Sequence, residues 1–145
     1  MGYWIPVAAM SLVLAGCAGT ATAPDHKTVS VDELSGQWQI ESIDQGGIID
    51  SSHITLTFTE DGRVSGSSGC NRYSASVSQQ DDRVLIHQAV STRMTCAPSL
   101  MQQEQRFLSA LQETTAFYTV SETWLVAEDA QGTPRLKMLP LSTGN

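Results

Sequence analysis

Short runs in which apolar and polar residues alternate constrain the fold of this 145-residue chain more than any other feature of its sequence. In residues 54–59, three apolar residues alternate with three threonines, the pattern of a strand with one buried face. The dipeptide Asp61-Gly62 follows and predicts a tight hairpin turn into a strand at 63–66. Comparable runs predict further strands at residues 37–43, 73–77, 84–87, 117–120, 123–127 and 135–139.

One segment near residues 99–111 has helical periodicity instead. Ser99 and Gln102 have the spacing of a capping box and predict the helix start, and Ser30 and Glu33 have the same spacing and predict one helical turn. The apolar stripe of the longer helix consists of Leu100, Phe107, Leu108 and Leu111. The sequence therefore predicts an α+β fold, a strongly bent antiparallel sheet or small barrel of seven to eight short strands with one amphipathic helix.

The N-terminus has the pattern of a bacterial lipoprotein signal. Residues 4–16 are uncharged and fall short of the ~20 residues that span a bilayer. The run Leu14-Ala15-Gly16-Cys17 is typical of a signal in which the cysteine becomes lipidated, although residues 1–4 lack the usual Lys or Arg. We expect residues 1–16 to be a signal peptide, residues 17–29 the lipidated Cys17 and a flexible tether, and residues 30–145 the folded domain.

The anchor at Cys17 predicts the membrane as a partner and the cell envelope as the location. Asp directly after the lipidated cysteine retains Gram-negative lipoproteins in the inner membrane. Here Ala18 follows Cys17, which favours the outer membrane with the domain facing the periplasm.

Of the three cysteines, Cys17 is assigned to the anchor, so Cys70 and Cys96 remain. Two cysteines in an oxidising compartment can pair, and we predict a Cys70–Cys96 disulfide between a glycine-rich loop and the helix entry. The alternative is two buried, reduced thiols.

Composition and motif spacing argue against several classes of function. The net charge is −7 and no basic patch with aromatic residues is present, so nucleic-acid binding is not expected. Neither metal-ligand spacing nor a phosphate-binding loop occurs, and we expect no metal and no cofactor. His53 or His87 is an available base for a catalytic cysteine, but no local motif supports a dyad, and we expect no enzymatic activity.

Glu104 lies within the apolar stripe of the predicted helix. A carboxylate on an inner helix face needs partners, because an unpaired buried charge is unfavourable. We predict a structural ion pair of Glu104 with Arg72 or Arg93, which flank the two cysteines. The alternative places Glu104 at a solvent edge of the stripe.

Two motifs give the chain a family resemblance. They are Gly69-Cys70-Asn71-Arg72-Tyr73 and Thr92-Arg93-Met94-Thr95-Cys96, in this order and followed by an amphipathic helix. With Gly36-Gln37-Trp38 on the first strand, residues 34–139 resemble the META domain family, including its HslJ-like heat-shock lipoproteins. The resemblance implies a bent antiparallel sheet around a helix and a link to heat shock and drug resistance, but no catalytic residue.

These observations favour a membrane-tethered, non-enzymatic envelope lipoprotein that serves as a stress-related accessory or binding domain. The alternative is a small-ligand carrier or a protease-inhibitor-like barrel that uses the interior or mouth of the sheet. An internal apolar cavity would favour the carrier, whereas a filled core with an exposed loop would favour the binding domain. An enzyme centred on Cys70 or Cys96 is a third interpretation.

Overall fold

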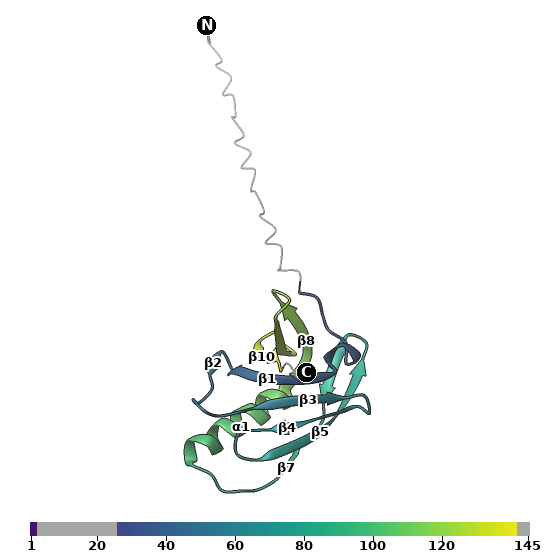
Figure 1. The fold of residues 1–145 in the computed structure, drawn as a ribbon. Helices are drawn as coiled ribbons and strands as arrows, with labels where there is room; N and C mark the ends of the chain where they lie inside the picture. Colours follow the sequence, from purple (N-terminus) through teal and green to yellow (C-terminus); the bar gives the residue numbers. More distant parts are fainter. Residues whose placement is uncertain (3–25, 142–145) are drawn as a thin grey trace.

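A computed structural model describes residues 1–2 and 26–141 (Figure 1). These residues form a 3₁₀ turn at Asp32–Leu34, one α-helix and ten strands. The helix α1 spans Pro98–Glu113, and the strands are β1 (Gly36–Ile43), β2 (Gly46–Gly47), β3 (Thr55–Thr59), β4 (Arg63–Ser67), β5 (Arg72–Gln80), β6 (Arg83–Ile86), β7 (Val90–Ser91), β8 (Thr114–Val120), β9 (Trp124–Asp129) and β10 (Pro134–Pro140).

The predicted signal peptide, the lipidation site Cys17 and most of the tether lie outside the described residues. The expectations for them stay predictions. Within the described ranges, no helix is long and apolar enough to cross a membrane.

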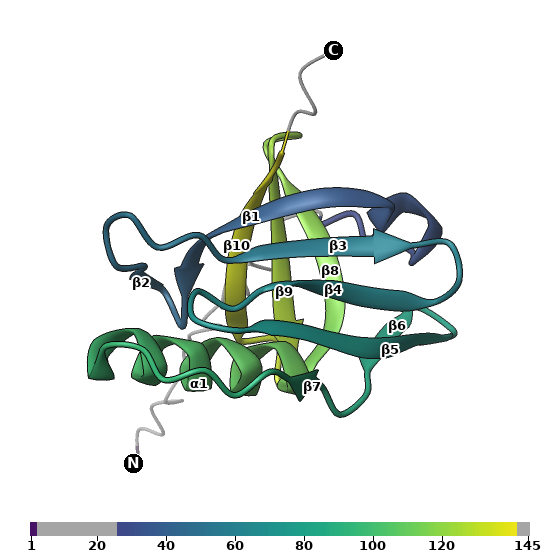
Figure 2. The same ribbon diagram turned by 60° about the horizontal axis from the view of Figure 1, so that its bottom comes forward.

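The strands form one antiparallel sheet that bends until its two ends meet (Figure 2). Eight strands follow the order β6-β5-β4-β3-β1-β10-β9-β8, and the two-residue strands β2 and β7 pair with β1 and β5. The end strands β6 and β8 lie against each other, so the sheet is a nearly closed barrel. This confirms the predicted α+β fold of a small antiparallel barrel with one helix.

The core forms where alternate side chains of the strands meet the apolar face of α1. On β3, Leu56 and Phe58 are buried and the threonines face outward. Phe58 packs edge-to-face against Phe117 of β8, with ring centroids 5.6 Å apart. From α1, the buried side chains are Gln103, Phe107, Ala110 and Leu111.

The two predicted helix starts have different outcomes. α1 begins at Pro98, its N-cap is Ala97, and no side chain caps it, so the predicted Ser99 cap is wrong. Proline suits the first helical position because it has no N–H to satisfy and a suitable φ, which moves the start ahead of Ser99. Near the N-terminus, Glu33 accepts a hydrogen bond from the Ser30 N–H at 3.0 Å, which confirms the predicted turn.

The folded domain begins before residue 30, which corrects the predicted boundary of the tether. The Val29 N–H donates to the Phe117 carbonyl at 2.8 Å, and Val29 is buried. The Thr119 N–H donates to the Lys27 carbonyl at 3.4 Å. Residues 27–29 thus pair with the edge of β8, which satisfies backbone groups that an unpaired edge would leave exposed.

Candidate functional site

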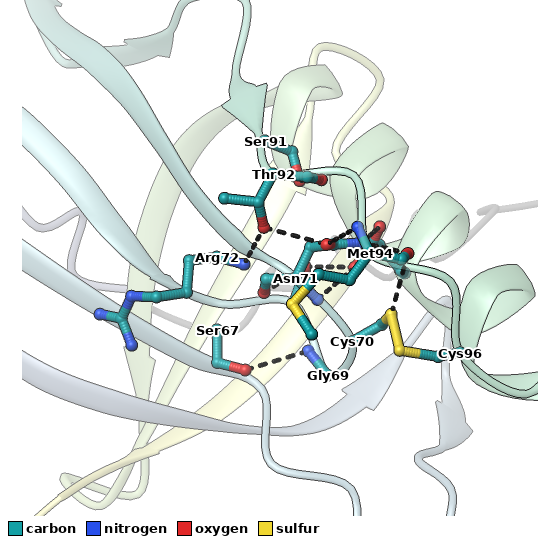
Figure 3. The surroundings of a disulfide bond; sticks show 11 residues. Ser67, Gly69, Cys70, Asn71, Arg72, Ser91, Thr92, Met94 and Cys96 are labelled. Atoms are coloured by element: carbon teal, nitrogen blue, oxygen red, sulfur yellow. Dashed lines mark hydrogen bonds between the residues drawn. A yellow bond between two sulfur atoms is a disulfide. The ribbon is translucent and has the colours of Figure 1, made fainter.

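Two loops meet beside the start of α1 and carry both motifs of the sequence (Figure 3). Residues 68–71 join β4 to β5, and residues 92–97 join β7 to α1; we call this meeting point the junction. Two glycines permit the close approach of the backbone. A Cβ atom on Gly66 would lie 2.0 Å from the Thr55 carbonyl oxygen, and Gly69 has φ +102°, which disfavours side chains.

The disulfide joins the two loops directly. Cys70 and Cys96 are bonded, with Cα atoms 6.0 Å apart, as the sequence predicted. Because each sulfur is bonded to the other, neither is a free thiol nucleophile in this oxidised form.

Asn71 is the centre of the hydrogen bonds behind the disulfide. Its side-chain oxygen accepts from the Met94 N–H at 2.7 Å and from the Thr92 hydroxyl at 2.9 Å. Its amide nitrogen donates to the Met94 carbonyl at 3.4 Å and to Glu104 Oε1 at 2.9 Å. The buried Asn71 therefore fixes the backbone of the second loop from both sides of Met94.

Glu104 is half-buried, but its partners differ from the predicted arginines. Its Oε2 accepts from the Ser68 hydroxyl at 2.6 Å and from the Asn71 N–H at 2.9 Å. These donors satisfy the carboxylate without a guanidinium. The predicted ion pair of Glu104 with Arg72 or Arg93 is therefore wrong, and both arginine side chains are exposed.

The alternation of inward and outward side chains along β5 explains why Arg72 faces away from Glu104. Tyr73 points inward, where its hydroxyl donates to the Thr55 carbonyl at 2.9 Å and burial raises its pKa. Its neighbour Arg72 must then face outward. Figure 3 shows the Arg72 guanidinium pointing away from Asn71 and the disulfide.

The outer side of the junction is apolar and cationic. Val90 is 68% exposed and Met94 is 64% exposed. Arg72 and Arg93, one in each motif, are also exposed, and neither is in an ion pair with any residue that the structure describes. We call these four residues the junction surface.

Sequence reasoning missed a second support of the junction. Gln103 is buried; its oxygen accepts from the Ile49 N–H at 2.6 Å, and its nitrogen donates to the Ser52 hydroxyl at 2.6 Å. The sequence feature that could have indicated this support is the position of Gln103, a polar residue directly before Glu104 on the inner side of the helix.

The residues considered for catalysis are not brought together. His53 is exposed, and His87 contacts the Ser78 hydroxyl at 2.9 Å on the exposed β5–β6 hairpin, not a cysteine. Among residues 1–2 and 26–141, no group of three or more His, Cys, Asp or Glu side chains could hold a metal ion.

The part of the chain that a known family model matches includes the junction. The family model of the META domain matches residues 32–139, which contain both loops and α1. A comparison with curated proteins gave no match.

Three solved structures share the fold. An NMR structure of a protein from Burkholderia xenovorans has a TM-score of 0.61 and 24% identity, and covers 83% of this chain and 98% of that one. A second NMR structure has a TM-score of 0.61 and 22% identity, and covers 81% and 99%. A crystal structure of a DUF4847 family protein from Bacteroides vulgatus has a TM-score of 0.54 and 13% identity, and covers 79% and 100%. Because the family model spans most of the sequence and includes the junction, the chain belongs to the META domain family.

Proposed function

We propose that this chain is a non-enzymatic, lipid-anchored domain of the bacterial cell envelope that binds another envelope protein through the junction surface. The observation that carries the proposal is the presentation of Met94. Its side chain is 64% exposed, while its backbone N–H and carbonyl both bond to the buried Asn71. Because the backbone at Met94 is already fixed, little backbone entropy is lost when a partner covers its side chain.

The chemistry of the junction surface indicates the kind of partner. Methionine and arginine are enriched at protein interfaces, and exposed apolar residues beside charged ones are typical of docking sites. Arg72 and Arg93 are exposed cations in the two motifs of a chain whose net charge is −7. We therefore expect the partner to offer an apolar pocket bordered by carboxylates.

The barrel interior argues against the carrier alternative. It is filled by large side chains that are fully buried, among them Phe107, Phe117, Ile40 and Met138. A filled interior favours a protein partner over a small ligand held inside the sheet.

The proposed location and stress role rest on the sequence and the family. The lipoprotein signal supports lipidation of Cys17, and Ala18 supports the outer membrane, with the domain in the periplasm. The resemblance to heat-shock lipoproteins supports a role under heat or drug stress.

The test places a photo-crosslinking amino acid at position 94 of the full-length, lipidated protein in its native envelope. We expect an adduct of defined mass after heat or drug stress. The adduct should be lost in the double variant Arg72→Glu/Arg93→Glu, because the reversed charges repel an acidic partner.

Two controls make this test specific. The probe at Thr57, on the outer face of β3, should give no such adduct, and Arg83→Glu, at an exposed position of β6, should leave the position-94 adduct unchanged. Equal adducts at positions 94 and 57, or an adduct that survives the double charge reversal, would count against the junction surface.

A further inference from the structure

A groove of about 530 Å³ lies on the outer face of β1, β10, β9 and β8, away from the junction. Its centre is one row of side chains in direct strand register. Ser42 pairs with Lys137, Lys137 with Val126, and Val126 with Tyr118. Val126 and Tyr118 are largely buried, so the row forms a mainly apolar floor.

The side of the groove near the β8–β9 turn combines an aromatic ring with a cation. Trp124 is half-buried, and the Lys137 ammonium lies 3.9 Å from the centroid of its ring. Within residues 26–141, Lys137 takes part in no ion pair, so its charge is available to a ligand.

The groove lies where the N-terminal segment joins the barrel. The His26 ring stacks on the groove residue Tyr118 with centroids 4.3 Å apart, and Lys27 continues along the edge of β8. Figure 1 shows the start of this segment and β8 together at the top of the barrel, with β7 at the bottom. Nine peptide units between Cys17 and His26 span at most about 30 Å, so an anchor at Cys17 keeps the groove close to the bilayer.

We infer that this groove is the face on which the domain rests against its membrane, with Trp124 among the lipid headgroups and the Lys137 ammonium beside lipid phosphates. The inference rests on the proposed lipid anchor at Cys17. Tryptophan and tyrosine favour the membrane–water interface, because each has an apolar body and a polar group. A lysine can keep its stem on apolar surface while its ammonium reaches the phosphates.

Charge and tethering determine how such a contact works. The net charge of −7 provides no general attraction to anionic lipids, so binding depends on this local set of side chains. A weak contact suffices, because the anchor holds the groove at a high effective concentration near the surface. The junction surface, at the other end of the barrel, then stays accessible to a partner protein.

The test uses the fluorescence of Trp124 in the mature, lipidated protein. Removal of the signal peptide eliminates Trp4, and Trp38→Phe leaves Trp124 as the only tryptophan. The protein is reconstituted into vesicles of phosphatidylethanolamine and phosphatidylglycerol whose acyl chains are brominated near the headgroup. We expect bromine to quench about half of the emission, since the indole would lie at the interface.

Matched variants identify the contact. Lys137→Glu should reduce the quenching severalfold, because the reversed charge repels lipid phosphates. Arg63→Glu makes the same charge change on β4 and should leave the quenching unchanged. If Trp38→Phe does not fold, the wild-type protein and Trp124→Phe give the Trp124 signal by difference.

The outcomes separate this inference from the proposed function. If the protein is anchored but Trp124 is as accessible to acrylamide as in an unlipidated form that lacks residues 1–17, the membrane-facing groove is overturned and the proposed function stands. If mass spectrometry finds no acyl chain on Cys17, the lipid-anchored function is overturned, and this inference with it.

Discussion

At the scale of single residues, Glu104 shows how a half-buried carboxylate can be satisfied without a cation. Its two oxygens accept from one hydroxyl, one backbone N–H and one side-chain amide, supplied by Ser68 and Asn71. Hydrogen bonds to an ionised group are stronger than those between neutral groups. The stability of the junction should therefore depend on this acceptor and not on nearby positive charge.

We expect Glu104→Gln to lower the free energy of unfolding by about 1.5–3 kcal/mol, the usual contribution of hydrogen bonds to a charged group. The glutamine NH₂ would face a donor in either orientation, so at least one bond is lost. Urea unfolding at neutral pH measures the change, and Glu60→Gln, at an exposed position after β3, is the matched control.

The arginines provide the complementary measurement. Arg72→Ala and Arg93→Ala should leave the unfolding midpoint almost unchanged, because neither side chain bonds to Glu104. A loss of stability in either arginine variant as large as that of Glu104→Gln would contradict the hydrogen-bond arrangement described above.

At the scale of elements, the junction is held by two independent means. The disulfide connects the loop after β4 to the entry of α1, while Asn71 connects the same two loops through hydrogen bonds. The covalent link acts mainly by restricting the unfolded chain, whereas the hydrogen bonds act in the folded state. Loss of the disulfide should therefore weaken the protein without changing its fold.

We expect Cys70→Ser/Cys96→Ser to lower the free energy of unfolding by ~3–4 kcal/mol, the chain-entropy value for cysteines 26 positions apart. Chemical denaturation measures this loss, and the circular dichroism spectrum should stay that of the oxidised protein. Reduced wild-type protein should match the double variant. A collapse of the native spectrum in the double variant would show that the hydrogen bonds alone cannot hold the junction.

The sequence predicts the elements whose partners are close along the chain. In hairpins such as β3–β4, apolar and polar residues alternate with a clear period of two, and each strand pairs with its neighbour in sequence. The sequence therefore predicts the positions of these strands. The two-residue strands β2 and β7 are too short to show a period. Residues 27–29 pair with β8, which lies about ninety positions further along the chain. No local sequence pattern predicts such a distant pairing.

The candidate site was predicted to a similar degree. Cysteine counting identified the disulfide, and helix periodicity placed Glu104 inward. Its partners were not identifiable, because spacing alone does not distinguish an amide and a backbone N–H from a guanidinium. The roles of Asn71 and Gln103 depend on loop conformations that the sequence does not display.

At the scale of the whole molecule, Arg135 at the start of β10 connects several elements. It bonds to Asp44 after β1 at 2.6 Å, to Glu113 at the end of α1, and lies 3.7 Å from Asp129 of β9. The hydrogen bond from Arg135 lowers the pKa of Glu113, while the backbone N–H of Thr133 is the main cause that lowers the pKa of Asp129.

These lowered values predict acid sensitivity. The backbone N–H of Ser30 is the main cause that lowers the pKa of Glu33 to about 2. A carboxyl with a lowered folded-state pKa stabilises the protein above its unfolded value, and this contribution disappears as pH falls through the folded value. We therefore expect the melting temperature to be stable above about pH 5 and to fall between about pH 4 and 2.

Calorimetry across this range measures the effect, and Arg135→Gln is the informative variant. Its melting temperature should depend less on pH, because the pKa of Glu113 would return toward its usual value. A melting temperature that stays constant down to pH 2 would contradict the assigned ionisation.

The position of β1 in the sheet has a consequence for how the protein is made. β1 pairs with β3, close in sequence, and with β10, which contains the last residues of the barrel. Until residues 134–140 are available, the half built from β3–β6 and the half built from α1, β8 and β9 lack the strand pair that joins them. Contacts of such long sequence separation form late and slowly. A chain that leaves a ribosome or a membrane pore with its N-terminus first therefore cannot close the barrel until its final strand has passed.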